Sequence, residues 1–394
     1  MSTASPGRID VRGGRRGDAQ APEQPIPHRQ REPRHAANSA LTCLGTRHRF
    51  QTMLDWIQSE AELEDRLSTP NAEDVAFFRE LEGDLLIIGV AGKMGPSLAR
   101  RVVCATRAAG VKRRIIGVSR FSTPSTELSL QQAGVETFRT DLLDSGAVSA
   151  LPDAQNVIFM AGRKFGSTGA ESLTWAMNAY LPALVAERFR HSRIVAFSSG
   201  NVYPLVPAES GGATEETSPA PVGEYAQSVL ARERIFEHFS RCHETPVTLL
   251  RLNYAIDLRY GVLLDIGSKV SEGRPVDVTM GFVNVIWQGD ANSVAIRALA
   301  QAQSPPLILN LTGMETLSTR ALANRFGEIF GKTPVLQGHE ASTALLNNAS
   351  LCWRMFGSPS VSVDQMIEWT ARWIMSAGAT LQKPTHFESR DGTF

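Results

Sequence analysis

Three glycines spaced three residues apart, Gly89, Gly92 and Gly95, form a GxxGxxG turn that could bind a pyrophosphate. The turn follows a short apolar run, DLLIIGV, and leads into a segment of helical character, GPSLARRVVCATRAAG. Glycines let the backbone turn tightly and let phosphate oxygens approach the N–H groups at the start of a helix. Because the required strand and helix flank the turn, we predict a dinucleotide site that includes Lys93 and Met94. The alternative is a tight strand–helix turn that binds no ligand.

The residues after the second predicted strand indicate which dinucleotide such a site would select. An NAD site commonly has an acidic residue there, which binds the ribose 2′-hydroxyl, whereas this chain has Ser119 and Arg120. A hydroxyl and a guanidinium suit a 2′-phosphate, which accepts hydrogen bonds and carries negative charge. We expect NADP or NAD as the cofactor, with NADP favoured. Alternatively, Arg120 is solvated and backbone contacts hold NAD.

The elements that position these residues alternate between strands and helices. Seven segments are expected to be strands, at 84–90, 113–119, 135–141, 156–162, 193–199, 246–253 and 307–313. Helices are expected at 95–110, 171–190, 224–241 and 319–331. This alternation predicts an α/β fold, a doubly wound parallel sheet of the Rossmann type, with ligands at the carboxyl ends of the strands.

Further motifs follow in a fixed order. They are Asp141-Leu142 after the third strand, Met160-Ala161-Gly162 after the fourth, Asn178 in the next helix, Ser198-Ser199-Gly-Asn-Val202-Tyr203 at the fifth strand, Tyr225 at a helix start, Arg251-Leu-Asn253-Tyr254, Trp287-Gln-Gly-Asp290-Ala291, Leu311-Thr-Gly313 and Leu317-Ser318. This ordered set, which spans residues 84 to about 375, resembles the extended short-chain dehydrogenase/reductase family, the NAD-dependent epimerases and dehydratases.

The resemblance implies a role for each motif. Asp141 and Leu142 would contact adenine, and the residues at 160–162, with Asn178, would line the cofactor side of the site. The phenol of Tyr225 would take or give a proton while hydride moves to or from the nicotinamide, and Ser199 would hydrogen-bond the same substrate oxygen. A free tyrosine titrates near ~10, so its pKa must fall before it can act as a base at neutral pH.

The chain departs from the family four residues after Tyr225. The family has a lysine there, which lowers the pKa of the tyrosine and holds the nicotinamide ribose, whereas this chain has Val229. None of the six lysines lies within four residues of Tyr225. Either Lys164 or Arg163, after the fourth strand, supplies the cation, or the nicotinamide charge suffices, or the protein binds nucleotide without turnover.

Composition excludes several other classes of protein. The 394 residues include 40 basic and 40 acidic side chains, and this balance disfavours a nucleic-acid binder. No apolar run reaches the ~18 residues of a membrane helix. The four cysteines form no CxxC pair and the histidines no HExxH motif, so we expect reduced thiols, no metal and a cytoplasmic location.

The expected organisation has five parts. They are a disordered Arg-rich extension (1–52), a helical lead-in (53–83), an NAD(P)-binding core (84–255 with about 284–312), a smaller C-terminal α/β substrate lobe (about 256–283 with 313–380) and a tail (381–394). The tail lacks periodicity, and it is either disordered or closes over a substrate. The resemblance implies a homodimer through the helices around Asn178 and Tyr225. It also implies a sugar or nucleotide-sugar epimerase, dehydratase or reductase, the alternative being a catalytically impaired NAD(P)-binding sensor.

Overall fold

The computed structural model describes residues 56–383 and 385–393. These described residues form one compact unit. The expected Arg-rich extension lies outside the described residues, so its disorder stays a prediction. Within the described ranges, no helix is both long enough and apolar enough to cross a membrane.

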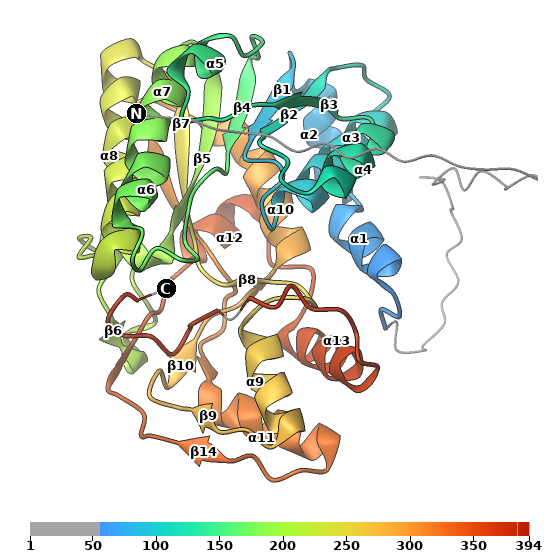
Figure 1. The fold of residues 1–394 in the computed structure, drawn as a ribbon, viewed down its shortest axis with the longest axis vertical. Coiled ribbons are helices and arrows are strands. Elements are labelled where there is room, and N and C mark those ends of the chain that lie inside the picture. Colours follow the sequence, from blue (N-terminus) through green and yellow to red (C-terminus); the bar gives the residue numbers. More distant parts are fainter. Residues whose placement is uncertain (1–55, 384, 394) are drawn as a thin grey trace, which may run out of the picture. The chain divides into compact units, whose positions relative to one another are not determined.

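A seven-stranded parallel sheet forms the centre of this unit (Figure 1). Its strands, in spatial order, are β12 (Leu307–Leu311), β7 (Val247–Leu252), β5 (Arg193–Ser199), β4 (Asn156–Phe159), β1 (Leu85–Ile88), β2 (Ile115–Ser119) and β3 (Glu136–Arg139). Each neighbouring pair is parallel. The order reverses between β1 and β4, the position at which doubly wound sheets bind ligands. All seven predicted strands and the Rossmann fold class are therefore confirmed.

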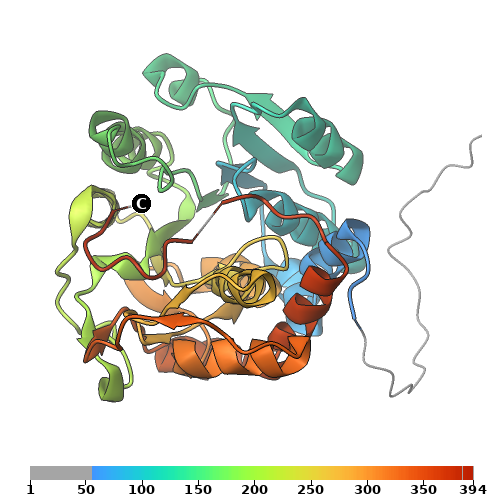
Figure 2. The same ribbon diagram turned by 60° about the horizontal axis from the view of Figure 1, so that its bottom comes forward.

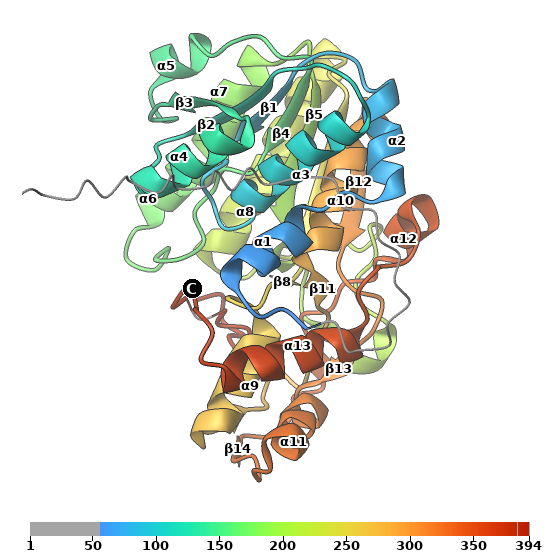
Figure 3. The ribbon, with the colours of Figure 1, turned by 90° about the vertical axis from the view of Figure 1, so that its right-hand side faces the viewer.

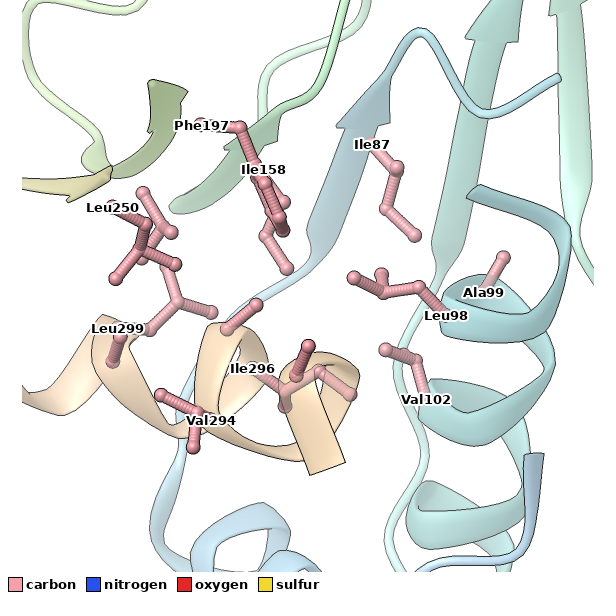
Figure 4. Packing of buried hydrophobic residues seen from close by; sticks show 14 of the residues in the cluster. Ile87, Leu98, Ala99, Val102, Ile158, Phe197, Leu250, Val294, Ile296 and Leu299 are labelled. Atoms are coloured by element: carbon pink, nitrogen blue, oxygen red, sulfur yellow. The ribbon is translucent and has the colours of Figure 1, made fainter. Parts of the chain in front are cut away.

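Alternate side chains of the buried strands enter two separate cores, as the two-residue period of a strand requires. Leu85 and Ile87 pack with helices on one face of the sheet, while Leu86 and Ile88 pack on the other. Figure 4 shows the first core, where Ile87 faces side chains of helices α3 (Gly95–Ala108) and α10 (Gln288–Arg297).

Helices cover both faces of the sheet (Figure 3). The first face carries α2 (Ala72–Glu80), α3 (Gly95–Ala108), α4 (Pro124–Ala133), α10 (Gln288–Arg297), the 3-10 turn η4 (Ala298–Gln301) and α12 (Ser350–Phe356). The second carries α5 (Ser145–Ser149), α7 (Leu181–Arg188) and α8 (Gly223–His243).

The helix predicted at 171–190 is interrupted by a wider turn. It consists of α6 (Glu171–Trp175), the π-helical turn η1 (Ala176–Tyr180) and α7. Pro182 lacks the N–H that would bond the carbonyl of Asn178 in a regular α-helix, which favours a break here. Asn178 is fully buried inside this π turn, a feature common at functional sites.

The remaining elements form a lobe below the carboxyl ends of the strands (Figure 1). Its helices are α9 (Val262–Glu272), α11 (Thr319–Phe330) and α13 (Val363–Met375). Two-residue strands pair as β8 (Ala255–Ile256) with β11 (Ile286–Trp287), β9 (Val276–Asp277) with β14 (Leu336–Gln337), β10 (Phe282–Val283) with β13 (Leu317–Ser318), and β6 (Val206–Pro207) with β15 (Thr343–Ala344). The lead-in contributes α1 (Glu60–Ser68), whose Leu63 and Leu67 join the apolar core of this lobe.

Candidate active site

A cavity of about 240 Å³ lies at the carboxyl ends of the central strands, between the sheet and the lobe. It brings together nine of the residues that the sequence predicts for the site: Gly89, Gly92, Lys93, Met94, Gly95, Met160, Lys164, Ser199 and Tyr225. The lining also includes Phe165, Tyr254, Tyr260 and Thr385. The glycine turn and the expected proton-transfer residues therefore face one space.

The three glycines of the turn differ in how much room the folded protein leaves for a side chain. Gly89 has φ +85°, and a Cβ there would lie 2.6 Å from the backbone nitrogen of Ala161. A Cβ at Gly95 would overlap the carbonyl of Val90, so this glycine allows α3 to pack closely against the end of β1. A Cβ at Gly92 would meet Gly89 O at 3.2 Å, a contact that small shifts relieve. Packing within the protein therefore requires a glycine less strictly at 92 than at 89 or 95.

The expected cofactor residues outside the cavity follow the neighbouring strands. Ser119 is half-buried and Arg120 exposed at the end of β2, where Arg139 donates to the Arg120 carbonyl over 3.3 Å. After β3, Asp141 accepts a hydrogen bond from the Leu143 N–H at 3.1 Å. These residues follow the ends of β2 and β3, the two strands that lie beside β1 on one side of the sheet.

Tyr225 and Ser199 lie together as the sequence predicts. Tyr225 is the third residue of α8, and its phenol shares a hydrogen bond with Ser199, the last residue of β5. Burial raises the pKa of the Tyr225 phenol, whereas the bond with Ser199 and the positive charge of Arg232 act to lower it. Ser199 also donates to Oδ1 of Asn201 over 2.8 Å, which fixes its hydroxyl.

Of the two candidate cations after β4, Lys164 is the one that lines the cavity. Its Nζ lies 5.8 Å from the ring centre of Tyr225 and 6.0 Å from that of Tyr254. Burial lowers the pKa of this amine to about 8, against the opposing effect of the Asp265 charge. Arg163 instead donates to the carbonyl of Gly166 over 2.8 Å.

Val229 stands in an apolar setting. Its side chain is 1% exposed and packs in a small cluster with Val202, Tyr203 and Ala213. At the position where the family has a lysine, this chain therefore has a buried apolar side chain. Residue 229 thus supplies no cation for Tyr225.

Lys93 shows how the glycine turn contacts the lobe. Its Nζ donates to the carbonyl of Ala255 over 3.1 Å, lies 3.9 Å from a carboxylate oxygen of Asp257, and stands 4.8 Å from the ring centre of Tyr260. Burial lowers its pKa to about 8, although Asp257 acts in the opposite direction. The turn is thus tied to the chain that follows β7.

Residues 385–393 of the predicted tail are packed, with Thr385 lining the cavity. Asp265 accepts hydrogen bonds from the Thr385 N–H at 2.8 Å and from its hydroxyl at 2.5 Å. Phe387 is fully buried in the lobe core, and Arg390 donates to the Thr343 carbonyl over 2.6 Å. Figure 2 shows this red segment crossing from α13 toward the start of α8, where Gly392 adjoins Gly223.

Sequence reasoning missed part of the cavity wall. Phe165 and Tyr260 belong to no motif, and their rings meet edge to face with centres 5.9 Å apart. Tyr254 ends the predicted Arg-x-Asn segment, but nothing in that pattern assigns it a role. The only sequence signal for Phe165 and Tyr254 is that each closely follows the end of a predicted strand, and Tyr260 carries no such signal.

The chain has a Rossmann-type α/β fold with a cavity at the carboxyl ends of its central strands. Residues 85–256 match the model of the NAD dependent epimerase/dehydratase family. The resemblance predicted from the motifs is confirmed over these residues. No curated protein gives a match to the sequence.

Solved structures of this class share the fold. A UDP-glucose 4-epimerase from Thermus thermophilus, in complex with NAD, is 21% identical with a TM-score of 0.62, covering 75% of this chain and 99% of that one. A dTDP-glucose 4,6-dehydratase from Bacillus anthracis, in complex with NAD, is 16% identical with a TM-score of 0.63, covering 74% and 96%. A UDP-glucuronic acid 4-epimerase from Bacillus cereus, in complex with UDP-glucuronic acid and NAD, is 17% identical with a TM-score of 0.61, covering 75% and 99%.

Proposed function

We propose that the protein is an NAD(P)-dependent epimerase, dehydratase or reductase that acts on a sugar or nucleotide sugar. The observation that carries this proposal is the meeting of Tyr225, Ser199 and Lys164 in one cavity beside the glycine turn. A proton-transfer group, a second hydroxyl and a cation then face the same space. This set is what a carbonyl–alcohol conversion needs from the protein.

The residues present fit a nicotinamide dinucleotide. The space kept at Gly92 would admit a pyrophosphate to the N–H groups at the start of α3. Asp141 and Leu142 would contact the adenine, and Ser119 with Arg120 would hold a 2′-phosphate, which is why we favour NADP. When bound, the nicotinamide supplies the acceptor or donor of hydride; the proton is handled by the chain.

Tyr225 would exchange that proton with the substrate oxygen, and Ser199 would hold the same oxygen by a hydrogen bond. Burial opposes ionisation of the phenol, so a cation must stabilise the phenolate if Tyr225 is to act as a base. Lys164 stands over its ring and, with a pKa of about 8, is mostly charged at neutral pH. The active form, a Tyr225 phenolate beside a charged Lys164, has lost one proton, so proton abstraction should strengthen as the pH rises toward about 8.

The lobe side of the cavity supports a sugar-type substrate. Phe165, Tyr254 and Tyr260 present ring surface beside the amine of Lys93 and the hydroxyl of Thr385. Such a wall combines apolar faces for C–H groups with a few polar groups that fix orientation. The named relatives bind UDP- or dTDP-linked sugars or act on them, and this wall is where the sugar would lie.

We also propose a homodimer through the helices around Asn178 and Tyr225. Leu173, Trp175 and Tyr180 on α6 and η1 are 38%, 36% and 51% exposed, a concentration of large apolar side chains on one segment. Sedimentation of the wild type should give a mass twice that of one chain. Tyr180→Arg should lower the measured mass toward that of a single chain. A wild type that sediments as a single chain would refute the dimer.

The function is tested by adding a panel of sugars and nucleotide sugars to the protein with NAD or NADP. The expected result is substrate conversion that disappears in Tyr225→Phe. Tight nucleotide binding without conversion of any panel member, and without a change of nicotinamide absorbance, would favour the alternative of a catalytically impaired sensor. Nucleotide binding itself is read independently by calorimetry.

A further inference from the structure

A second buried cation lies on the helix that carries Tyr225. Arg232 follows Tyr225 by seven residues, close to two helical turns, so both side chains lie on the same face of α8. It is only 6% exposed. Its Nη1 donates to the carbonyl of Phe197 over 2.7 Å, and its Nη2 donates to Oδ1 of Asn178 over 2.8 Å. The guanidinium is thus held between β5 and the π turn.

Asn178 connects this guanidinium to the loop of Lys164. Its Oδ1 also accepts the Arg163 N–H at 2.8 Å, and its Nδ2 donates to the Arg163 carbonyl over 2.9 Å. Both backbone groups of the residue before Lys164 are therefore fixed by one side chain. The same Nδ2 donates to Ser228 Oγ over 3.0 Å, and Ser228 donates to the carbonyl of Tyr225 over 2.8 Å.

Gly162 leaves the space that this arrangement needs. A Cβ at this position would lie 2.5 Å from Nη2 of Arg232 and 3.0 Å from Oδ1 of Asn178. The guanidinium also stacks with its carbon 5.4 Å from the ring centre of Phe159, the last residue of β4. A small residue on the loop and a large cation on the helix thus fit one another.

We propose that Arg232 is a positioning residue that compensates for the missing lysine: through Asn178 it holds the Lys164 loop against Tyr225, and its own charge adds to the positive field there. The proposal rests on the proposed function, because that function gives Lys164 and Tyr225 their chemistry. Burial lowers the pKa of Arg232 to about 10, so the side chain remains charged at neutral pH. Lys164 lies over the ring of Tyr225, and Arg232 lies two turns further along α8, from where its charge acts on the phenol.

The test measures the titration of Lys164 directly. An amine-acylating reagent labels the protein at a series of pH values, and peptide mass spectrometry follows labelling of Lys164. In the wild type the midpoint should be near pH 8. Arg232→Met keeps the apolar bulk of the side chain but removes the positive charge of the guanidinium and its hydrogen bonds to Phe197 and Asn178. Releasing the loop exposes the amine to water, and this should raise the midpoint by one pH unit or more.

The matched control is Arg234→Met, an exposed arginine of the same helix that pairs with Glu237; it should leave the midpoint unchanged. Asn178→Ala breaks the connection without removing the charge, and it should also raise the midpoint. An unchanged midpoint in either folded variant, checked by thermal unfolding, would overturn the proposal. The readout needs no substrate, so a failure to find conversion would count against the proposed function and leave this inference standing.

Discussion

Gly92→Val is expected to abolish tight nucleotide binding while leaving the protein folded. The new Cβ would lie 3.2 Å from Gly89 O, a contact that a shift of a few tenths of an ångström relieves. The two methyl groups would occupy the space at the start of α3 where a pyrophosphate must approach the backbone. The substitution therefore separates binding from folding, which neither Gly89 nor Gly95 allows.

The expected loss follows from the hydrogen bonds at stake. A hydrogen bond to a charged group contributes about 1.5–3 kcal/mol. Preventing one backbone N–H from reaching a phosphate should thus weaken binding by roughly 10- to 150-fold, and preventing two should weaken it further. The substitution should lower the free energy of unfolding by only ~1 kcal/mol, since the close contact with Gly89 O is relieved by a small shift.

Calorimetry with NAD and with NADP measures the loss, and thermal unfolding confirms the fold. The control is Ala108→Val, which places the same side chain at an exposed position of α3 away from the turn and should leave affinity unchanged. Undiminished affinity in folded Gly92→Val would refute the assignment of this turn to the pyrophosphate.

Three further outcomes are expected. Arg120→Ala should weaken NADP by on the order of 1.5–3 kcal/mol, with little effect on NAD; equal losses in calorimetry would show that Arg120 does not select the 2′-phosphate. Phe387→Ala should destabilise the lobe by up to ~3–5 kcal/mol, because the ring is fully buried; an unchanged melting temperature would contradict the packing of residues 385–393. The folded-state pKa of Lys164 is about 8, below the ordinary lysine value of 10.5. Between pH 8 and 10.5 the unfolded chain therefore holds a proton on this amine that the folded chain has lost. The free energy of unfolding should consequently rise with pH over this range. Lys164→Met should reduce that rise, measured by denaturant titration, whereas a profile identical to that of the wild type would contradict the shifted pKa; exposed Lys112→Met is the control.

The sheet was predictable from sequence because its strands carry a local signal. Runs such as LLII are buried on both faces and need no knowledge of their neighbours to be recognised. Helix α10 lacked such a signal. Nine of its ten residues are buried, and several of these are polar. Burial of the polar side chains of Gln288 and Asn292 is possible because both donate hydrogen bonds to Ser97 on α3. A helix buried on nearly every side shows no clear amphipathic period.

The site was predictable where a residue is fixed by the end of a strand. Ser199, Lys164 and the glycine turn all stand within a few residues of such an end, and the sheet brings these ends together. Thr385 and Tyr260 were not predictable, since their position depends on how the lobe folds back. The role we assign to Arg232 depends on the π turn at Asn178. Pro182 favours a break in this helix, but no local pattern specified that the break is a π turn or that Asn178 contacts Arg232.

The most direct test of the central claim is nicotinamide absorbance during incubation with the sugar panel, compared between wild type and Tyr225→Phe. Both proteins should bind the dinucleotide with similar affinity, because the phenol is not among the groups expected to hold the phosphates. We expect conversion by the wild type, increasing as the pH rises toward about 8, and at least a hundredfold loss in Tyr225→Phe, roughly the lower range for removal of a general base. Full turnover by Tyr225→Phe would contradict the role of this phenol and with it the proposed function.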